Sequence, residues 1–191
     1  MKTMTFEPSI RLGDRTLRIN TGERQQLGCF VQILARINSS LEAMLSRYCK
    51  IYVVQFVFHP DQPLGNNALI SDLMRVICKQ LERAYRSKLA YGWVRETGQN
   101  GNPHYHIVLI LNANKVRHQY GIRERVCRII ETRDHPRPAF NTKSHLIHRH
   151  DDETYQQAFH HLSYLAKTST KGQKPKTANE YSFSRLKALA P

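Results

Sequence analysis

Two histidines separated by a single residue, His104 and His106, open an apolar segment that ends at Leu111. Successive side chains of a β-strand point to opposite faces, so both imidazoles are predicted to project from the same face. Two imidazoles at that spacing can share one divalent ion, and Mn²⁺ is a suitable one. The apolar strand behind them predicts a rigid support. The alternative is a pair of polar residues at a frayed strand end, because a chain with 10 histidines contains such pairs by chance.

Glu96 is the candidate third ligand, and its position depends on the turn between two strands. If residues 100–101 were the two central residues of a tight turn, Glu96 would lie on the opposite face from His104. A loop with an odd number of residues, or a bulge, would place the two side chains together. Pro103 cannot donate to the strand ladder, which favours an irregular register. The alternative is an exposed hairpin carboxylate.

A helical pattern from Asp151 or Asp152 to about Lys167 separates two tyrosines. Tyr155 falls on the apolar face, whereas Tyr164 lies nearly opposite, on a polar face with His160, His161 and Lys167. A phenol has a pKa near 10 and is a poor nucleophile at neutral pH, but nearby positive charge favours the phenolate. Lys167 is therefore a candidate to activate Tyr164 or to offset charge in a transition state. The alternative is an exposed tyrosine beside a solvated lysine, and the pattern of this helix considered alone favours that alternative.

The charge of the chain points to a polyanionic partner. The 191 residues include 29 Lys plus Arg against 15 Asp plus Glu, giving a formal net charge of +14. Nucleic acid is the first candidate for such an excess. A basic run after the tyrosine helix, formed by Lys171, Lys174 and Lys176, is predicted to contact DNA phosphates and to make binding salt-dependent. The alternative for each lysine is a solvated surface charge.

The cysteines and the apolar runs predict a cytoplasmic location. The 4 cysteines form no Cys-x-x-Cys pair, and three lie in apolar helical contexts, which predicts buried free thiols in a reducing compartment. Residues 1–20 have no signal-peptide pattern. No apolar run approaches the roughly 20 residues that span a bilayer. A soluble protein without a membrane partner is therefore expected.

The predicted elements alternate between strands and helices in an α+β order. Hydrophobic periodicity predicts a long helix over 23–48, and β-branched and aromatic residues predict a strand over 51–58. A helix of about 22 residues from Asn66 or Asn67, strands over 90–97 and 104–111, a helix over 119–132 and a strand over 144–148 follow. This order predicts a central antiparallel sheet with helices on one or both faces, a ferredoxin-like plan in a single domain.

The His-Tyr-His strand and the Tyr-Leu-Ala-Lys helix together resemble the HUH replication initiators, and most closely the inovirus gene-two-protein family with its prophage relatives. The matching segments are residues 51–59, residues 93–96 leading into 103–112, and residues 163–171. The resemblance implies an HUH fold for residues 46–172. Residues 1–45 would then be an N-terminal arm and helix, and residues 173–191 a basic tail.

The resemblance also implies a mechanism. A divalent ion, Mg²⁺ or Mn²⁺, held by His104, His106 and Glu96, would polarise a scissile phosphate in single-stranded DNA at a replication origin. Tyr164 would attack phosphorus and become a 5′-phosphotyrosine. The released 3′-hydroxyl would prime rolling-circle replication of a phage or prophage element, with host replication proteins as further partners. Because Tyr155 and Tyr164 face opposite sides of the helix, a single active tyrosine is predicted.

Three other functions compete with this hypothesis. A catalytically inactive, nucleic-acid-binding regulator would use the same basic surface. An HUH transposase or relaxase would share the chemistry, although a relaxase usually carries a third histidine ligand and Glu96 argues against it. A small metal-dependent hydrolase would use His104, His106 and a carboxylate without a covalent intermediate.

Overall fold

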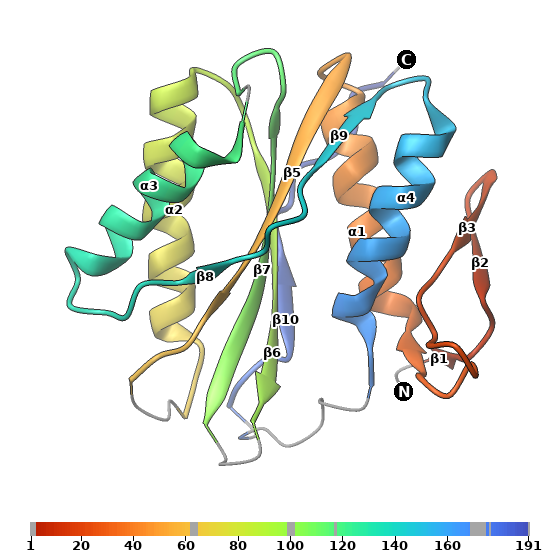
Figure 1. Ribbon diagram of the computed structural model, residues 1–191, viewed down its shortest axis with the longest axis horizontal. Coiled ribbons are helices and arrows are strands. Elements are labelled where there is room, and N and C mark those ends of the chain that lie inside the picture. The colour runs from red at the N-terminus through yellow and green to blue at the C-terminus, as the bar shows by residue number, and fades with distance from the viewer. Residues whose placement is uncertain are drawn as a thin grey trace.

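The fold centres on an antiparallel sheet with helices on both faces (Figure 1). A computed structural model describes residues 3–61, 65–98, 102–116, 118–168, 175 and 177–190. Among these residues the main sheet has six strands in the order β10-β6-β7-β5-β8, with β9 also pairing with β5. The strands are β5 (Lys50–Phe58), β6 (Ala90–Thr97), β7 (Pro103–Asn112), β8 (Ala139–Phe140), β9 (His145–His148) and β10 (Tyr181–Phe183). The predicted α+β class is confirmed.

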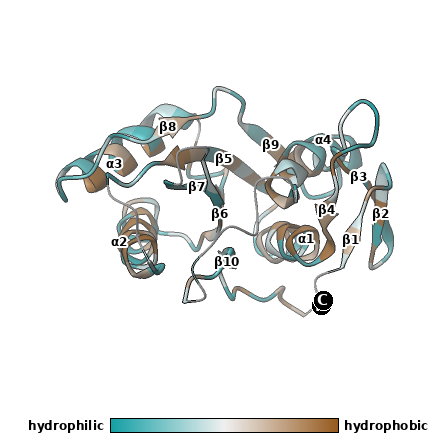
Figure 2. Cartoon of the chain, turned by 90° about the horizontal axis from the view of Figure 1, so that it is seen from below, coloured by the Kyte–Doolittle hydropathy of each residue, from teal (hydrophilic) through white to brown (hydrophobic). Residues whose placement is uncertain are grey.

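The helices lie in pairs on opposite faces of the sheet, so the molecule has three layers (Figures 1 and 2). On one face are α1 and α4, and on the other are α2 and α3. Their bounds are α1 (Val31–Leu45), α2 (Ala68–Tyr85), α3 (Gln119–Glu131) and α4 (Asp152–Leu162). Each face of the sheet has its own apolar core, and this explains why β5 and β7 are apolar on both sides.

The alternation of side chains assigns the candidate site to one face. Val53 and Val108 belong to the core under α1 and α4, whereas Phe56 and Tyr105 belong to the core under α2 and α3. Because side chains alternate along a strand, even-numbered residues of β7 point toward α1 and α4. The side chains of the His-x-His pair therefore lie on the α1–α4 face.

The first long helix is shorter than the sequence pattern predicts, and the prediction of a helix over 23–48 was wrong at its start. Gly22 and Gln25 both have positive φ angles, of 81° and 52°, which no α-helix accommodates. Cys29 and Phe30 form β4 (Cys29–Phe30), which pairs with β1 (Met4–Thr5). The helix α1 therefore begins at Val31.

Both ends of the chain contribute to the structure around the core. Part of the predicted N-terminal arm forms a separate hairpin of β2 (Ser9–Leu12) and β3 (Arg15–Arg18), with Gly13 at a φ of 59° in its turn. Its Leu17 is buried in the core under α1 and α4. Near the other end, β10 pairs with β6 and extends the main sheet. The flanking segments thus share one body with residues 46–172.

The four cysteines are free thiols that differ in exposure. Cys29 and Cys127 are buried and Cys78 is partly buried, as expected for three apolar contexts, although Cys29 lies in a strand. Cys49 is exposed, and its thiol contacts the side chain of Asn114. Within the described part of the chain, no helix combines the length and the apolar character needed to cross a bilayer.

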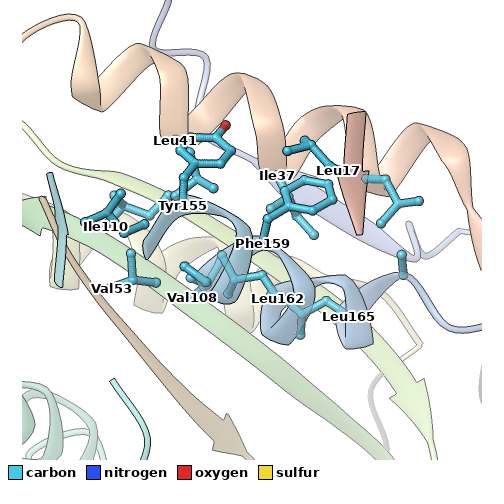
Figure 3. Packing of buried hydrophobic residues seen from close by; sticks show 14 of the residues in the cluster. Leu17, Ile37, Leu41, Val53, Val108, Ile110, Tyr155, Phe159, Leu162 and Leu165 are labelled. Carbon is cyan, nitrogen blue, oxygen red and sulfur yellow. The ribbon is translucent and has the colours of Figure 1, made fainter. Parts of the chain in front are cut away.

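The apolar side of α4 packs in the core between α1 and the sheet (Figure 3). Tyr155, Phe159 and Leu162 project from α4 between α1 and the sheet. Tyr155 is buried, which confirms its prediction as a core residue. Its hydroxyl donates a hydrogen bond of 2.7 Å to Oδ1 of Asn38 on α1.

The variant Tyr155→Phe is expected to lower the free energy of unfolding by about 1–2 kcal/mol, because it leaves the buried Asn38 oxygen without its donor. Chemical denaturation followed by circular dichroism measures this difference. The exposed Tyr120 provides a matched control, and Tyr120→Phe should change stability by less than about 0.5 kcal/mol. Equal midpoints for Tyr155→Phe and the wild type would contradict the expectation.

Candidate metal and tyrosine site

The register between β6 and β7 brings the candidate ligands to one face. Glu96 pairs with His104, and Thr97 pairs with Pro103, so the connecting loop spans residues 98–102. This loop has an odd number of residues, the case in which Glu96 lies opposite His104 rather than on the other face. Gly98 closes the loop by donating its N–H to the carbonyl oxygen of Asn102 at 2.9 Å.

Glu96, His104 and His106 form a group with the geometry of a metal site. One carboxylate oxygen, Oε2 of Glu96, lies 3.4 Å from Nε2 of His104 and 3.3 Å from Nε2 of His106. Ligand atoms about 2.1 Å from a shared ion, at angles between a right angle and the tetrahedral one, are about 3.0–3.4 Å apart. Glu96 is only 5% exposed. The group can therefore hold a metal ion, as predicted from the sequence.

The mixed nitrogen and oxygen donors restrict which ions suit this group. Carboxylate and imidazole together suit Mn²⁺, Fe²⁺ or Zn²⁺, and a carboxylate also suits Mg²⁺. A carboxylate so little exposed needs a cationic or hydrogen-bonded partner, and a divalent ion would provide one. The donor set therefore fits a divalent ion.

A third histidine, His59, lies beside this group, and the sequence interpretation did not assign it a role. Its ring stacks on that of His104 with 5.3 Å between centroids. Burial lowers the pKa of His59, and the charges of the two neighbouring histidines act in the same direction. The sequence contained a signal for the position of His59, because this residue continues the odd-numbered positions of β5 that face α1 and α4. Using it required the register of β5 against β7.

Tyr164 lies on a tight turn after α4 rather than on the α-helix itself. The α-helix ends at Leu162, and the 3₁₀-helix η1 (Ser163–Ala166) follows, so the predicted helix to Lys167 was too long. The buried hydroxyl of Ser163 donates to the carbonyl oxygen of His160 at 2.6 Å and accepts from the N–H of Asn20 at 2.8 Å. The second of these contacts ties the turn to the N-terminal segment.

The tight turn directs Tyr164 toward the metal group. The Tyr164 ring meets the His106 ring edge to face, with centroids 6.5 Å apart. Tyr164 is 46% exposed, so a ligand can reach part of this residue. The chain thus brings the predicted nucleophile and the predicted metal ligands to one surface, from elements far apart in the sequence.

Lys167 lies against Tyr164, as its sequence position predicts. Its Nζ is 3.7 Å from the centroid of the Tyr164 ring, a cation–π contact. Burial lowers the pKa of Lys167, whereas the charges of Cys29 and Glu96 oppose that change. The backbone of Lys167 forms a bridge with Cys29, which holds this end of the turn. The three predicted DNA-contacting lysines, Lys171, Lys174 and Lys176, lie outside the described residues.

A pair of hydrogen-bonded histidines borders the same face. Nε2 of His145 on β9 lies 2.7 Å from Nδ1 of His161 on α4. Oδ1 of Asn141 accepts the backbone N–H of Lys143, so its Nδ2 is the atom that faces Nε2 of His161 at 3.4 Å. Because the amide nitrogen donates, Nε2 of His161 accepts and its Nδ1 carries the hydrogen donated to His145. The sequence held no sign of this pair, because it depends on how β9 packs against α4.

This histidine pair makes the stability of the fold depend on pH. Burial lowers the pKa of His145 to about 4, and the charges of His161 and Lys143 act in the same direction. In the unfolded chain the imidazole has a pKa near 6.5. Between these values the unfolded chain binds the proton and the folded chain does not. The stabilisation is therefore complete above about pH 6.5 and is lost as the pH falls toward about 4.

The variant His145→Asn is expected to flatten this dependence. Wild-type stability should fall by up to about 3 kcal/mol between pH 7 and pH 4, and the variant should lose less over the same range. Urea denaturation at a series of pH values measures both curves. His150→Asn, at an exposed histidine, is the matched control and should follow the wild type. Parallel curves for all three proteins would show that His145 does not carry the effect.

One family model matches the chain across this whole site. It is the model of the YagK/YfjJ C-terminal domain, and it matches residues 14–183. Because the match covers most of the chain, the chain belongs to this family. No curated protein and no solved structure matches it. The matched range includes every site residue from Glu96 to Lys167.

Proposed function

We propose that this member of the YagK/YfjJ C-terminal domain family is a metal-dependent nickase of single-stranded DNA that cuts through a covalent bond to Tyr164. An accessible tyrosine lies beside His106, and His106 belongs to a Glu-His-His group that can hold a divalent ion. This placement is the observation that carries the proposal. A fixed metal ligand set and a nucleophile on one surface are the two parts that such a reaction needs. The assignment of the fold as ferredoxin-like and of the HUH type is part of this proposal.

The residues would divide the chemistry between them. The hydroxyl oxygen of Tyr164 attacks the phosphorus of a phosphodiester, and the bond from phosphorus to the 3′-oxygen breaks. The products are a 5′-phosphotyrosine and a strand ending in a 3′-hydroxyl, which takes up the proton that Tyr164 gives up. When bound, a divalent ion would polarise a non-bridging phosphate oxygen. Lys167, close to the Tyr164 ring, offsets negative charge as the phenolate forms.

The covalent step conserves the energy of the phosphodiester bond. The 3′-hydroxyl can attack the phosphotyrosine and rejoin the strand without another energy source. A free 3′-hydroxyl is also a primer for DNA synthesis. This chemistry is what the initiation of rolling-circle replication of a phage or prophage element requires, and we propose that role. The formal net charge of +14 supports a DNA partner.

The test is an adduct assay with the full chain. A pool of single-stranded DNA is incubated with the protein and Mn²⁺, and products are separated on a denaturing gel. We expect a protein–DNA adduct that forms with Mn²⁺ and does not form with EDTA. Cleavage without an adduct would favour a hydrolase. Salt-sensitive binding with neither cleavage nor adduct, on substrates that carry an origin of the element encoding the protein, would favour a regulator.

A further inference from the structure

A cleft of about 420 Å³ opens beside Tyr164 on the same face as the metal group. This volume lies within the range of roughly 300–1,000 Å³ that is usual for small-molecule sites. His106 and Tyr164 form one end of its lining, and Gln55, Asn141 and His161 provide polar groups. Asn20, held by its N–H bond to Ser163, completes the wall, so the N-terminal segment takes part in the cleft.

One residue that lines this cleft carries a buried polar atom that the fold leaves without a partner among the described residues. Nε2 of Gln55 is buried and has no hydrogen-bond partner among the described residues. The neighbouring polar groups are already committed to one another, because Asn141 donates to His161 and His161 donates to His145. A buried donor without a partner lowers the stability of the fold by about 1–3 kcal/mol. Such a donor has an explanation when a ligand provides its acceptor.

We propose that this cleft binds one unpaired nucleobase of the DNA strand, and that Gln55 donates a hydrogen bond to an acceptor on the edge of that base. The inference rests on the proposed function, because it places the base next to the phosphate that Tyr164 would attack. A carbonyl oxygen or a ring nitrogen, which each base carries, can accept from Gln55. Unpaired bases are the parts of a single strand that a protein can read in this way.

The lining fits a base better than a phosphate. Among the described residues that form it, none is a lysine or an arginine, so the cleft offers no fixed positive charge. Its walls are instead largely apolar, with Val57, Ala139 and Leu165 among them. A base has two apolar faces and a polar edge, and aromatic side chains such as Tyr164 are suited to stack on it. The cleft would thus hold a base, and not a phosphate, beside the cut.

The test compares strands with and without bases, in the absence of metal. Fluorescent 12-nucleotide strands of dT, dC and dA, and an abasic strand of equal length, are titrated with the full chain in EDTA, and anisotropy gives each Kd. We expect at least one base-containing strand to bind the wild type at least about fivefold more tightly than the abasic strand. Gln55→Met should reduce the ratio of the affinity for that strand to the affinity for the abasic strand by about fivefold. It should leave the affinity for the abasic strand itself unchanged.

Stability separates this role from a structural one. Because Nε2 of Gln55 gives up no hydrogen bond in the fold, Gln55→Met should melt at or above the wild-type temperature while losing base-dependent affinity. Gln80→Met, at an exposed glutamine on α2, is the matched control and should change neither property. A Gln55→Met variant that weakens binding to all four strands equally would overturn the proposal.

The metal-free assay also separates this inference from the proposed function. Base-dependent binding without any adduct on substrates that carry an origin of the element encoding the protein would support the cleft and overturn the nickase. Adduct formation by a wild type that binds base-containing and abasic strands equally would overturn the cleft and leave the nickase standing. A wild type that binds no strand at low salt would overturn both.

Discussion

Replacing Tyr164 with phenylalanine is expected to abolish the protein–DNA adduct, lowering its rate of formation at least about a thousandfold. The substitution removes one oxygen atom, the one that would form the bond to phosphorus. A water molecule can attack in its place only slowly, because water has no fixed position relative to the phosphate. The measurement is adduct formation on a denaturing gel with a strand that the wild type cuts in Mn²⁺.

The structure also predicts what Tyr164→Phe leaves unchanged. Tyr164 is 46% exposed, and none of the hydrogen bonds found among the described residues involves its hydroxyl. Its ring keeps the contacts with His106 and Lys167 when the oxygen is removed. Stability should therefore stay within about 0.5 kcal/mol of the wild type, and affinity for single-stranded DNA within about threefold. These values distinguish a lost reaction from a lost fold.

Two other tyrosines act as controls for this experiment. Tyr120→Phe alters an exposed tyrosine and should form the adduct at the wild-type rate. Tyr155→Phe should form it too, at temperatures where the destabilised variant is folded, because Tyr155 is buried under α1. Phosphodiester cleavage that persists in Tyr164→Phe would refute the covalent mechanism. An adduct lost only in Tyr155→Phe would mean that the helix pattern identified the wrong nucleophile.

The central strands could be predicted because their local pattern and their tertiary role agree. Residues 90–97 were predicted as a strand and form β6 with those bounds, and the apolar runs around 51–58 and 104–111 form β5 and β7. Each is rich in β-branched or aromatic residues and is buried on both faces, so no competing interaction changes its structure. The side of β7 that carries both histidines follows from alternation.

The elements that were predicted less well depend on distant contacts. The turn carrying Tyr164 is tied to the N-terminal segment by a hydrogen bond between Ser163 and Asn20, residues far apart in the sequence. The long first helix gives way to a strand because Cys29 and Phe30 pair with β1. In both cases the local periodicity was helical, and the competing backbone partner came from the N-terminal segment. A helical period does not show where such a partner will interrupt it.

The candidate site likewise has features that the sequence could predict and features that depend on distant contacts. Which residues could bind a metal was visible from their chemical types, but whether Glu96 joined them depended on the parity of one loop. A tight turn centred on residues 100–101 would have given the even case, and the register shows the odd one. The unpaired amide of Gln55 and the pairing of His145 with His161 arise where β8, β9 and α4 meet around β5. No sequence spacing encodes a meeting of that kind.

The variant Glu96→Gln is expected to weaken Mn²⁺ binding by at least about 100-fold and to abolish adduct formation at low micromolar ion. Glu96 contributes the only anionic atom of the described group, and that atom lies within 3.4 Å of both imidazole nitrogens. Changing residues that merely orient a metal ligand already costs about 10–100-fold in affinity, so loss of a charged ligand should cost at least as much. Glutamine keeps the shape of the side chain and removes its charge.

Thermal melting gives a readout that does not depend on DNA. An ion that binds only the folded chain, at about 100 times its Kd, stabilises that chain by about 2.7 kcal/mol. For a protein of this size that corresponds to a rise in Tm of about 5–10 °C. Wild-type protein should show this rise on addition of Mn²⁺, and Glu96→Gln should not at the same concentration. Glu153→Gln, at an exposed glutamate on α4, should respond like the wild type.

The two readouts together decide what the Glu-His-His group does. If Glu96→Gln loses both the Mn²⁺-dependent rise in Tm and the adduct, the buried carboxylate acts as a metal ligand that the reaction needs. If the rise in Tm is lost but adduct formation persists in EDTA, the ion serves the fold and Tyr164 reacts without it. If the wild type itself shows no rise with Mn²⁺, Mg²⁺ or Zn²⁺, the close approach of Glu96 to His104 and His106 is an ion pair. The metal-dependent mechanism would then have to be abandoned.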